Sequence, residues 1–356
     1  MLNLITRCLA AVILLLGLSS VPAKAQTLLT GAGATFPHPL YAKWFRDYQS
    51  IDPEVGFTYQ ATGSGDGIAK ILAREVDFGA SDKFLDDAEL KGAPGKLLQI
   101  PTVMGAVAVT YRLPGIGAGL KLTPQTLAGI YLGRITRWND PLLVRLNPSL
   151  KLPAQDIVVL HRADSSGTTA IFTDYLSSVS EPWRKRAGKG TTVNWPAGTG
   201  AKGSGGLAAG IKDTPYSIGY VELAYALENE LPTAALKNRS GRFVSPTMLA
   251  TRAAAVHSMQ RLDRGVLQQV QEETDEIDCR ISLVNQPGKD TYPIVGLTWL
   301  LVYQQQEHEK GRKLVEFLLW ELKKAEKMTS TLHYTPLPKS LALQVERTIR
   351  SINVPE

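Results

Sequence analysis

Residues 28–45 read Leu-Leu-Thr-Gly-Ala-Gly-Ala-Thr-Phe-Pro-His-Pro-Leu-Tyr-Ala-Lys-Trp-Phe and predict a strand, a glycine-rich turn and a helix in succession. The apolar run at 28–30 indicates a short strand, and Leu40 and Trp44 lie on one face of the helix that follows. Pro37 suits a first helical turn, where a backbone N–H has no partner within the helix. This strand–turn–helix order is typical of an α/β protein.

Short strand-like runs alternate with helical patterns along almost the whole chain, which predicts an α/β fold. The further strands are expected at 55–60, 76–80, 103–111, 156–161, 217–221 and 293–303, and the further helices at 68–76, 123–131, 168–176, 311–324 and 340–352. The two strands at 103–111 and 293–303 are long and apolar, so they are candidates for chain crossings between two lobes. We interpret the glycine-rich stretches at 63–67 and 198–206 as ordered turns.

The N-terminus has the pattern of a cleaved signal peptide. An apolar run at 8–21 precedes Ala23 and Ala25, whose small-x-small spacing signal peptidase accepts, so Gln26 should begin the mature chain. A membrane anchor is the alternative, but this run is shorter than the roughly 20 residues that a spanning helix needs. The sequence therefore predicts an exported protein.

Length and charge set limits on the class of protein. The chain has 356 residues, and the part after the signal peptide is long enough for two ordinary domains. Its formal net charge of +6 falls to +4 without Arg7 and Lys24, the charged residues of that peptide. Mild basicity suits an anionic ligand and ordinary surface charge equally well. Basic clusters with interleaved aromatic residues, which would indicate nucleic-acid binding, are missing.

The cysteines and histidines give no sign of a disulfide, a cofactor or a metal. Only Cys279 remains after processing, so an intramolecular disulfide is excluded, and a structural thiol is favoured over a nucleophile. The histidines are scattered, without the spacing of metal ligands, at His38, His161, His257, His308 and His333. We therefore expect neither a metal site nor a cofactor.

Three segments place small or hydroxylated residues between a predicted strand and a predicted helix. They read Gly-Ala-Gly-Ala-Thr-Phe at 31–36, Thr-Gly-Ser-Gly-Asp-Gly at 62–67 and Arg-Ala-Asp-Ser-Ser-Gly-Thr at 162–168. A helix start offers unpaired N–H groups and a partial positive charge, which together bind tetrahedral oxyanions. Hydroxyl groups donate further hydrogen bonds, and Arg162 adds a fixed fork of donors.

Each segment alone is explained by an ordinary helix cap. Three of them beside an arginine favour an anion site, because strand ends in an open α/β sheet face one crevice. Asp82 also follows a predicted strand and has the same two readings. Asp66 is interpreted as a first-turn acid that the helix dipole favours.

Several of these segments are those of a known family. The sequence resembles the periplasmic phosphate-binding proteins of phosphate ABC importers, in order and over nearly all of the mature chain. The matching segments are Gly-Ala-Gly-Ala-Thr-Phe-Pro at 31–37, Gly-Ser-Gly at 63–65, Val-Asp-Phe-Gly-Ala-Ser-Asp at 76–82, Tyr-Leu-Gly-Arg-Ile-Thr-Arg-Trp at 131–138, Arg-Ala-Asp-Ser-Ser-Gly-Thr at 162–168, Gly-Tyr-Val-Glu at 219–222 and Tyr-Pro-Ile at 292–294.

The resemblance implies the periplasmic-binding-protein type II fold, with two α/β lobes joined by a two-strand hinge around a ligand cleft. The expected boundaries are a signal peptide at 1–25, lobe I at 26–110 and 292–356, and lobe II at 111–291. It also implies a monomeric periplasmic protein, not an enzyme, that captures inorganic phosphate and delivers it to the transmembrane permease of an ABC transporter. No nucleic acid is expected as a partner.

The resemblance also implies the residues of the site. Thr35, Phe36, Ser64 and Asp82 would contact phosphate from the first lobe, and Arg162, Ser166, Gly167 and Thr168 from the second, with Asp164 holding Arg162. Phosphate near neutral pH keeps a proton that a carboxylate can accept, whereas sulfate has none. Asp82 would therefore favour phosphate over sulfate.

Two positions depart from the family pattern. Asp66 would weaken anion binding if it faced the anion and would only cap its helix if it faced solvent. Lys83 and Phe84 replace the small and proline residues expected after Asp82. These departures bear on affinity, and they leave every matched ligand position in place.

Other functions remain as alternatives. An exported phosphatase or esterase would need a nucleophile with a base or a metal, and the sequence has no GxSxG motif. Residues 198–203 match GxGxxG, but Pro196 precedes them where a dinucleotide site needs a strand. A third alternative keeps the fold and binds sulfate or molybdate, and a fourth reports phosphate to a membrane sensor. Glu222 is expected either in contact with a permease or on a solvated face.

Overall fold

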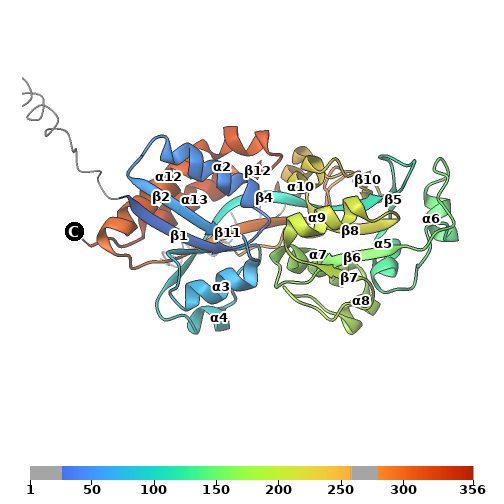
Figure 1. Cartoon of the computed structure of the whole chain (residues 1–356), viewed down its shortest axis with the longest axis horizontal. Helices are drawn as coiled ribbons and strands as arrows, with labels where there is room; N and C mark the ends of the chain where they lie inside the picture. The colour runs from blue at the N-terminus through green and yellow to red at the C-terminus, as the bar shows by residue number, and fades with distance from the viewer. Residues whose placement is uncertain (1–25, 257, 259–279, 356) are drawn as a thin grey trace, which may run out of the picture.

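The computed structural model describes residues 26–256, 258 and 280–355 (Figure 1). The predicted signal peptide and Cys279 lie outside the described residues. The molecule is elongated, and two α/β halves lie end to end along its long axis (Figure 1). Blue and red segments from the two ends of the chain build one half, and green and yellow segments build the other. The α/β prediction is confirmed.

One mixed sheet runs through both halves. In the described part of the chain its main path has the order β2, β1, β3, β11, β4, β8, β6, β7, and β12 pairs with β4 off this path. The strands are β1 (Thr27–Gly33), β2 (Val55–Gln60), β3 (Phe78–Ser81), β4 (Leu97–Arg112), β6 (Val158–Arg162), β7 (Thr199–Ala201), β8 (Ser217–Glu222), β11 (Val295–Tyr303) and β12 (Thr335–Pro336). We call the half with β1, β2, β3 and β11 the first lobe and the half with β6, β7 and β8 the second lobe.

Strand β4 belongs to both lobes. Its residues 97–106 pair antiparallel with β11, and its residues 107–112 pair antiparallel with β8. The second chain crossing runs beside it, because the Val107 N–H donates to the Ile294 carbonyl at 2.8 Å. Both long apolar strands were predicted. However, among the described strands β11 itself pairs only with β3 and β4, so the crossing lies in the residues just before β11.

Helices cover the sheet in both lobes. The first lobe holds α2 (His38–Gln49), α3 (Ser64–Leu72), α4 (Asp87–Lys91), α12 (His308–Thr331) and α13 (Lys339–Arg350); the second holds α5 (Pro124–Tyr131), α6 (Pro141–Leu146), α7 (Gly167–Val179), α8 (Glu181–Arg186), α9 (Gly203–Asp213) and α10 (Leu223–Glu228). A small sheet of β5 (Lys121–Leu122), β9 (Ala235–Lys237) and β10 (Phe243–Val244) completes the second lobe. No helix in the described ranges is long and apolar enough to cross a membrane.

The predicted elements differ from the observed ones mainly at their ends. Helix α3 begins at Ser64 and ends at Leu72, although the apolar spacing predicted a helix from 68 to 76. The helix stops there because Arg74 adopts a left-handed backbone with φ of 56°. Starting at Ser64 places the glycine-rich turn directly at the helix N-terminus, which positions the site described next.

Candidate anion site between the lobes

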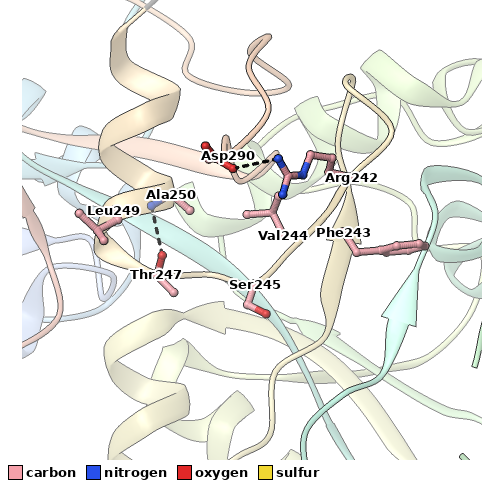
Figure 2. A pocket seen from close by; sticks show the side chains of 8 residues that line it. All are labelled: Arg242, Phe243, Val244, Ser245, Thr247, Leu249, Ala250 and Asp290. Carbon is pink, nitrogen blue, oxygen red and sulfur yellow. Dashed lines mark hydrogen bonds and ion pairs between the residues drawn. The ribbon is translucent and has the colours of Figure 1, made fainter. Parts of the chain in front are cut away.

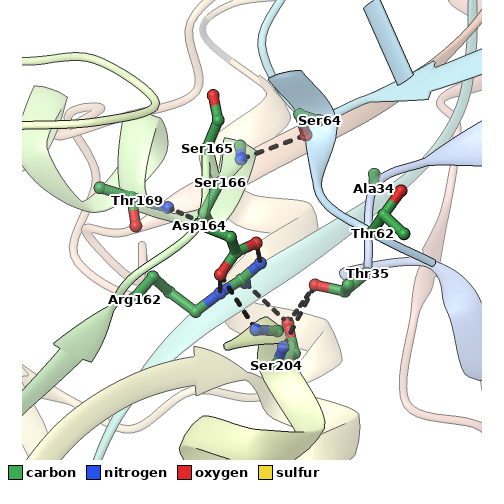
Figure 3. Close-up of polar contacts among 12 residues, drawn as sticks. Ala34, Thr35, Thr62, Ser64, Arg162, Asp164, Ser165, Ser166, Thr169 and Ser204 are labelled. Carbon is green, nitrogen blue, oxygen red and sulfur yellow. Dashed lines mark hydrogen bonds and ion pairs between the residues drawn. The ribbon is translucent and has the colours of Figure 1, made fainter. Parts of the chain in front are cut away.

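The starts of α3 and α7 meet where the two lobes touch (Figure 3). The Gly167 N–H of α7 donates to the Ser64 hydroxyl of α3 at 3.1 Å. The Gly65 N–H of α3 donates to the Ser165 carbonyl at 3.0 Å. Two helix N-termini from different lobes, with their partial positive charges, therefore converge on one place.

Asp82 lies beside these helix starts at the end of β3. Its N–H donates to the Ser64 hydroxyl at 3.1 Å, and its carboxylate accepts from the Thr298 hydroxyl at 2.8 Å. The side chain is only 4% exposed. Burial raises the pKa of Asp82 to about 7, although Thr298, Arg162 and Ser64 act in the opposite direction. A carboxyl with this pKa can hold or accept a proton near neutral pH.

Arg162 ends β6 and is fixed by Asp164. Its Nε donates to Asp164 Oδ1 at 2.7 Å, and its Nη2 donates to Asp164 Oδ2. The Gly203 N–H also donates to Asp164 Oδ1 at 2.9 Å. Burial opposes ionisation of Asp164, but the hydrogen bonds and charge of Arg162 outweigh it and hold the pKa of Asp164 below its usual value. The pair therefore carries a buried, oriented guanidinium.

Helix α7 contributes hydroxyl groups at its first turn. Ser166 is the N-cap, and its hydroxyl accepts from the Thr169 N–H at 3.1 Å. Thr168 is 1% exposed, and its hydroxyl has no hydrogen-bond partner among the described residues. A buried hydroxyl without a partner is costly in a folded protein, so Thr168 marks a place where a polar ligand would satisfy it.

Ser204 is a site residue that the sequence analysis missed. Its hydroxyl lies 2.7 Å from the Thr35 hydroxyl, and Arg162 Nη1 donates to it at 3.1 Å (Figure 3). Ser204 lies in the first turn of α9, inside the glycine-rich stretch that we interpreted as a turn. That stretch instead holds β7 and the start of α9, so the prediction there was wrong. The signal was the serine directly after the GxGxxG motif.

Phe36 provides backbone rather than side-chain chemistry. Its ring is fully buried and packs edge-on against Tyr334 at 6.2 Å between ring centroids. Its carbonyl accepts from the Tyr334 hydroxyl at 2.6 Å. Both the ring and the carbonyl of Phe36 are thus in contact with Tyr334, the residue just before β12.

All the predicted contact positions therefore gather at the lobe junction. Ser64, Asp82 and Gly167 form one connected group, and Thr35 joins Arg162 through Ser204. Ser166 starts the helix to which Gly167 and Thr168 belong.

The unusual residues near the site are paired with neighbouring side chains. The Asp66 carboxylate accepts a hydrogen bond from the Thr62 hydroxyl and pairs with Lys70 at 3.1 Å. The Thr62 hydrogen bond, and after it Lys70, lowers the pKa of Asp66, although burial acts in the opposite direction. Lys83 pairs with Glu89 at 2.6 Å. Asp66 is thus the first-turn acid of α3 that the sequence indicated, and no described side chain caps the start of this helix.

Glu222 is a correction to the sequence analysis. We expected it on the surface, but it is fully buried at the end of β8, opposite Val107 of β4. One carboxylate oxygen accepts from the Ala224 N–H at 2.7 Å, and the other has no hydrogen-bond partner among the described residues. Burial raises the pKa of Glu222 well above its usual value. Neither expected role, contact with a permease or a solvated face, fits a fully buried residue.

A separate cavity of 300 Å³ lies on the second lobe (Figure 2). Arg242, Phe243, Leu249 and Asp290 are among its lining residues, and none of the anion-site residues lines it. In the described ranges, no group of three His, Cys, Asp or Glu side chains is placed to hold a metal ion.

Comparisons with known proteins show the family to which this chain belongs. A model of the PBP superfamily domain matches residues 20–321. A phosphate-binding protein PstS of Xylella fastidiosa is 38% identical over 336 residues, which cover 93% of this chain and 88% of that protein. A protein of the same name from Pasteurella multocida is 39% identical over 325 residues, with coverages of 91% and 90%.

Solved structures show the same fold. The phosphate-binding protein of Stenotrophomonas maltophilia superposes with a TM-score of 0.64 at 21% identity, over 90% of this chain and 93% of that one. A high-affinity periplasmic phosphate-binding protein bound with phosphate gives a TM-score of 0.68, also at 21% identity, with the same coverages. The predicted fold class, two α/β lobes of the periplasmic-binding-protein type, is confirmed. The chain belongs to the PBP superfamily and, within it, to the PstS family of phosphate-binding proteins.

Proposed function

We propose that this protein is the exported solute-binding component of a phosphate ABC importer, which captures inorganic phosphate between its lobes and delivers it to a transmembrane permease. The mature chain would begin at Gln26, act in the periplasm as a monomer and bind no nucleic acid. Its lobes would comprise 26–110 with 292–356, and 111–291. The relatives named above are phosphate-binding proteins, which supports binding without catalysis.

One observation carries the proposal: the Gly167 N–H reaches the Ser64 hydroxyl at 3.1 Å across the lobes, beside the buried carboxyl of Asp82. A phosphate oxyanion at this point would accept from both helix starts and from Arg162. The unpartnered hydroxyl of Thr168 would donate to it, as would Ser64, Ser166, Thr35 and the backbone N–H groups of Phe36 and Gly167.

Asp82 gives the site its preference for a protonated anion. Phosphate carries a proton near neutral pH and can donate a hydrogen bond through it to the ionised Asp82 carboxylate. Sulfate has no proton to donate, so the negative carboxylate repels it. The other groups of the site donate hydrogen bonds to any tetrahedral oxyanion, so they do not distinguish phosphate from sulfate. Asp82 therefore selects the ligand, and Arg162 with the helix starts provides the affinity.

Capture would proceed by lobe closure. The donors come from both lobes, so the anion binds the closed form better than the open form and shifts the population toward closure. Two adjacent chain crossings at Val107 and Ile294 suit such a hinge, since few backbone bonds need to change. The closed form would then dock on the permease.

Titration calorimetry tests this proposal directly. The mature protein, freed of phosphate by unfolding and refolding, should bind one phosphate per chain and give no heat with sulfate at neutral pH. Arg162→Ala should abolish measurable phosphate binding while the protein still folds, and Lys185→Ala, an exposed residue of α8 in the same lobe, is the matched control. Silence of the wild type toward phosphate, or sustained release of phosphate from a chromogenic ester, would contradict the proposal.

A further inference from the structure

Three consecutive carbonyls in the loop after β1 each accept a hydrogen bond from a tyrosine hydroxyl. Tyr59 donates to Ala34 O at 2.7 Å, Tyr225 to Thr35 O at 2.7 Å, and Tyr334 to Phe36 O at 2.6 Å. The tyrosines come from β2, from α10 and from the residue just before β12. None of the three was singled out by the sequence.

These bonds fix the direction of the loop's N–H groups. In a trans peptide the C=O and the N–H of one unit point in opposite directions. Holding Ala34 O therefore orients the N–H of Thr35, and holding Thr35 O orients the N–H of Phe36. Among the described residues, neither N–H donates to a backbone or side-chain acceptor. The Phe36 carbonyl differs, because Pro37 follows it and has no N–H to orient.

Tyr225 also differs from the other two tyrosines because its hydrogen bond joins one lobe to the other. It belongs to α10, directly after second-lobe strand β8, whereas Thr35 follows first-lobe strand β1. Its side chain is 8% exposed, so its hydrogen bond is shielded from water. Among the described residues of the first lobe, Thr35 O is otherwise held only by a longer bond of 3.3 Å from the His38 N–H.

We propose that Tyr225 is a positioning residue that couples lobe closure to anion capture. When the lobes meet, its hydroxyl fixes the Thr35–Phe36 peptide so that the Phe36 N–H faces the anion. The full donor set of the first lobe is therefore assembled only in the closed form. This inference rests on the proposed function, since it assigns the Phe36 N–H to the bound phosphate.

The test compares Tyr225→Phe with Tyr334→Phe, because each removes one hydroxyl bonded to a neighbouring carbonyl. Stopped-flow kinetics should show phosphate leaving Tyr225→Phe roughly fivefold faster, the effect of one net hydrogen bond, with an unchanged association rate. Tyr334→Phe should release phosphate at the wild-type rate. In amide NMR spectra, phosphate should shift the Phe36 resonance less in Tyr225→Phe than in the wild type, and the Thr35 resonance equally in both.

A ligand-free measurement separates this inference from the proposed function. Spin labels at Ile51→Cys and Leu142→Cys, exposed positions in opposite lobes, report lobe separation in a Cys279→Ser background. Tyr225→Phe should move the label distances toward longer values, and Tyr334→Phe should not. A wild type that ignores phosphate would refute the proposed function alone. The role of Tyr225 would be overturned if Tyr225→Phe left the label distances unchanged. It would also be overturned if Tyr225→Phe released phosphate at the wild-type rate and showed the wild-type shift of the Phe36 resonance.

Discussion

Asp82 combines burial with a position at the meeting point of the two lobes, so its protonation state should decide which anion binds. Asp82→Asn replaces an acceptor of the phosphate proton with an amide that can donate to a fully deprotonated anion. We expect phosphate to bind at least tenfold more weakly and sulfate binding to become measurable, about the effect of one charge-assisted bond. Calorimetric titrations with both anions at pH 7 measure the ratio. A ratio equal to that of the wild type would remove Asp82 as the selecting residue.

Glu321 of α12 is a third buried acid besides Asp82 and Glu222, and it should make stability depend on pH. It is 1% exposed, and neither carboxylate oxygen has a hydrogen-bond partner among the described residues. Burial raises its pKa well above the ordinary 4.5, so the folded protein holds this proton more tightly than the unfolded chain. The resulting stability is present below pH 4.5 and is lost as pH rises toward the raised pKa.

Glu321→Gln should therefore be more stable than the wild type at pH 8, with the difference shrinking toward pH 5. Its loss of stability with pH should be less steep by up to about 1.4 kcal/mol per pH unit, the value for one proton. Urea unfolding at several pH values measures this. The control is Glu316→Gln on the exposed face of the same helix, where solvent screens the charge. Parallel curves for wild type and Glu321→Gln would contradict the prediction.

The sequence identified those site residues that can be recognised from their neighbours along the chain. Ser64, Asp82 and Arg162 each stand at a strand end or a helix start, and the resemblance to a known family added their roles. Ser204 and Tyr225 were missed because they act on the loop of Thr35 and Phe36 from 169 and 190 residues away. Contacts of that kind follow from the assembled fold, which a single sequence does not reveal.

At the scale of elements, the start of α7 controls how closely the lobes approach. A Cβ atom on Gly167 would lie 2.3 Å from the Ser64 hydroxyl oxygen and 2.6 Å from Asp82 Cβ. Both neighbours belong to the other lobe, so Gly167→Ala should hold the lobes apart. We expect phosphate affinity to fall at least a hundredfold while the ligand-free protein keeps its thermal stability. Calorimetry and thermal unfolding measure the two effects.

Gly206→Ala in α9 is the matched control, because a Cβ there meets no atom within 4 Å. It should leave phosphate affinity unchanged and stabilise the protein by about 1 kcal/mol, the difference between alanine and glycine in a helix. If Gly167→Ala bound phosphate as tightly as Gly206→Ala does, close approach at this helix start would not be needed for capture.

The longest strands were predictable and the shortest were not, for a physical reason. Strands β4 and β11 carry apolar runs longer than a turn can hold, and helix α5 has the Thr123 cap and the first-turn proline that the sequence indicated. Strands β5, β9 and β10 have only two or three residues each, too few for any period to appear. Helix α9 was hidden by its glycines, which favour turns by local preference but are overridden here by packing against β6 and β8.

For the whole molecule, the decisive feature is that β4 is shared. Its 16 residues pair with β11 in one lobe and with β8 in the other, and nearly all of them are buried. Neither lobe can lose β4 without exposing core residues of the other lobe, so the two lobes should depend on each other for stability, although the proposed capture moves them relative to each other. We therefore expect the protein to unfold in one cooperative transition.

Phosphate should shift that single unfolding transition to a higher urea concentration without splitting it in two. If only the folded protein binds, stability rises by RT ln(1 + [L]/Kd), so a phosphate concentration 1,000 times the measured Kd should add about 4 kcal/mol. Urea unfolding followed by tryptophan fluorescence reports on both lobes, because Trp44 and Trp138 are fully buried in different ones. Arg162→Ala should unfold identically with and without phosphate. A second transition that phosphate leaves in place would mean that one lobe unfolds independently, and that sharing β4 does not couple the two.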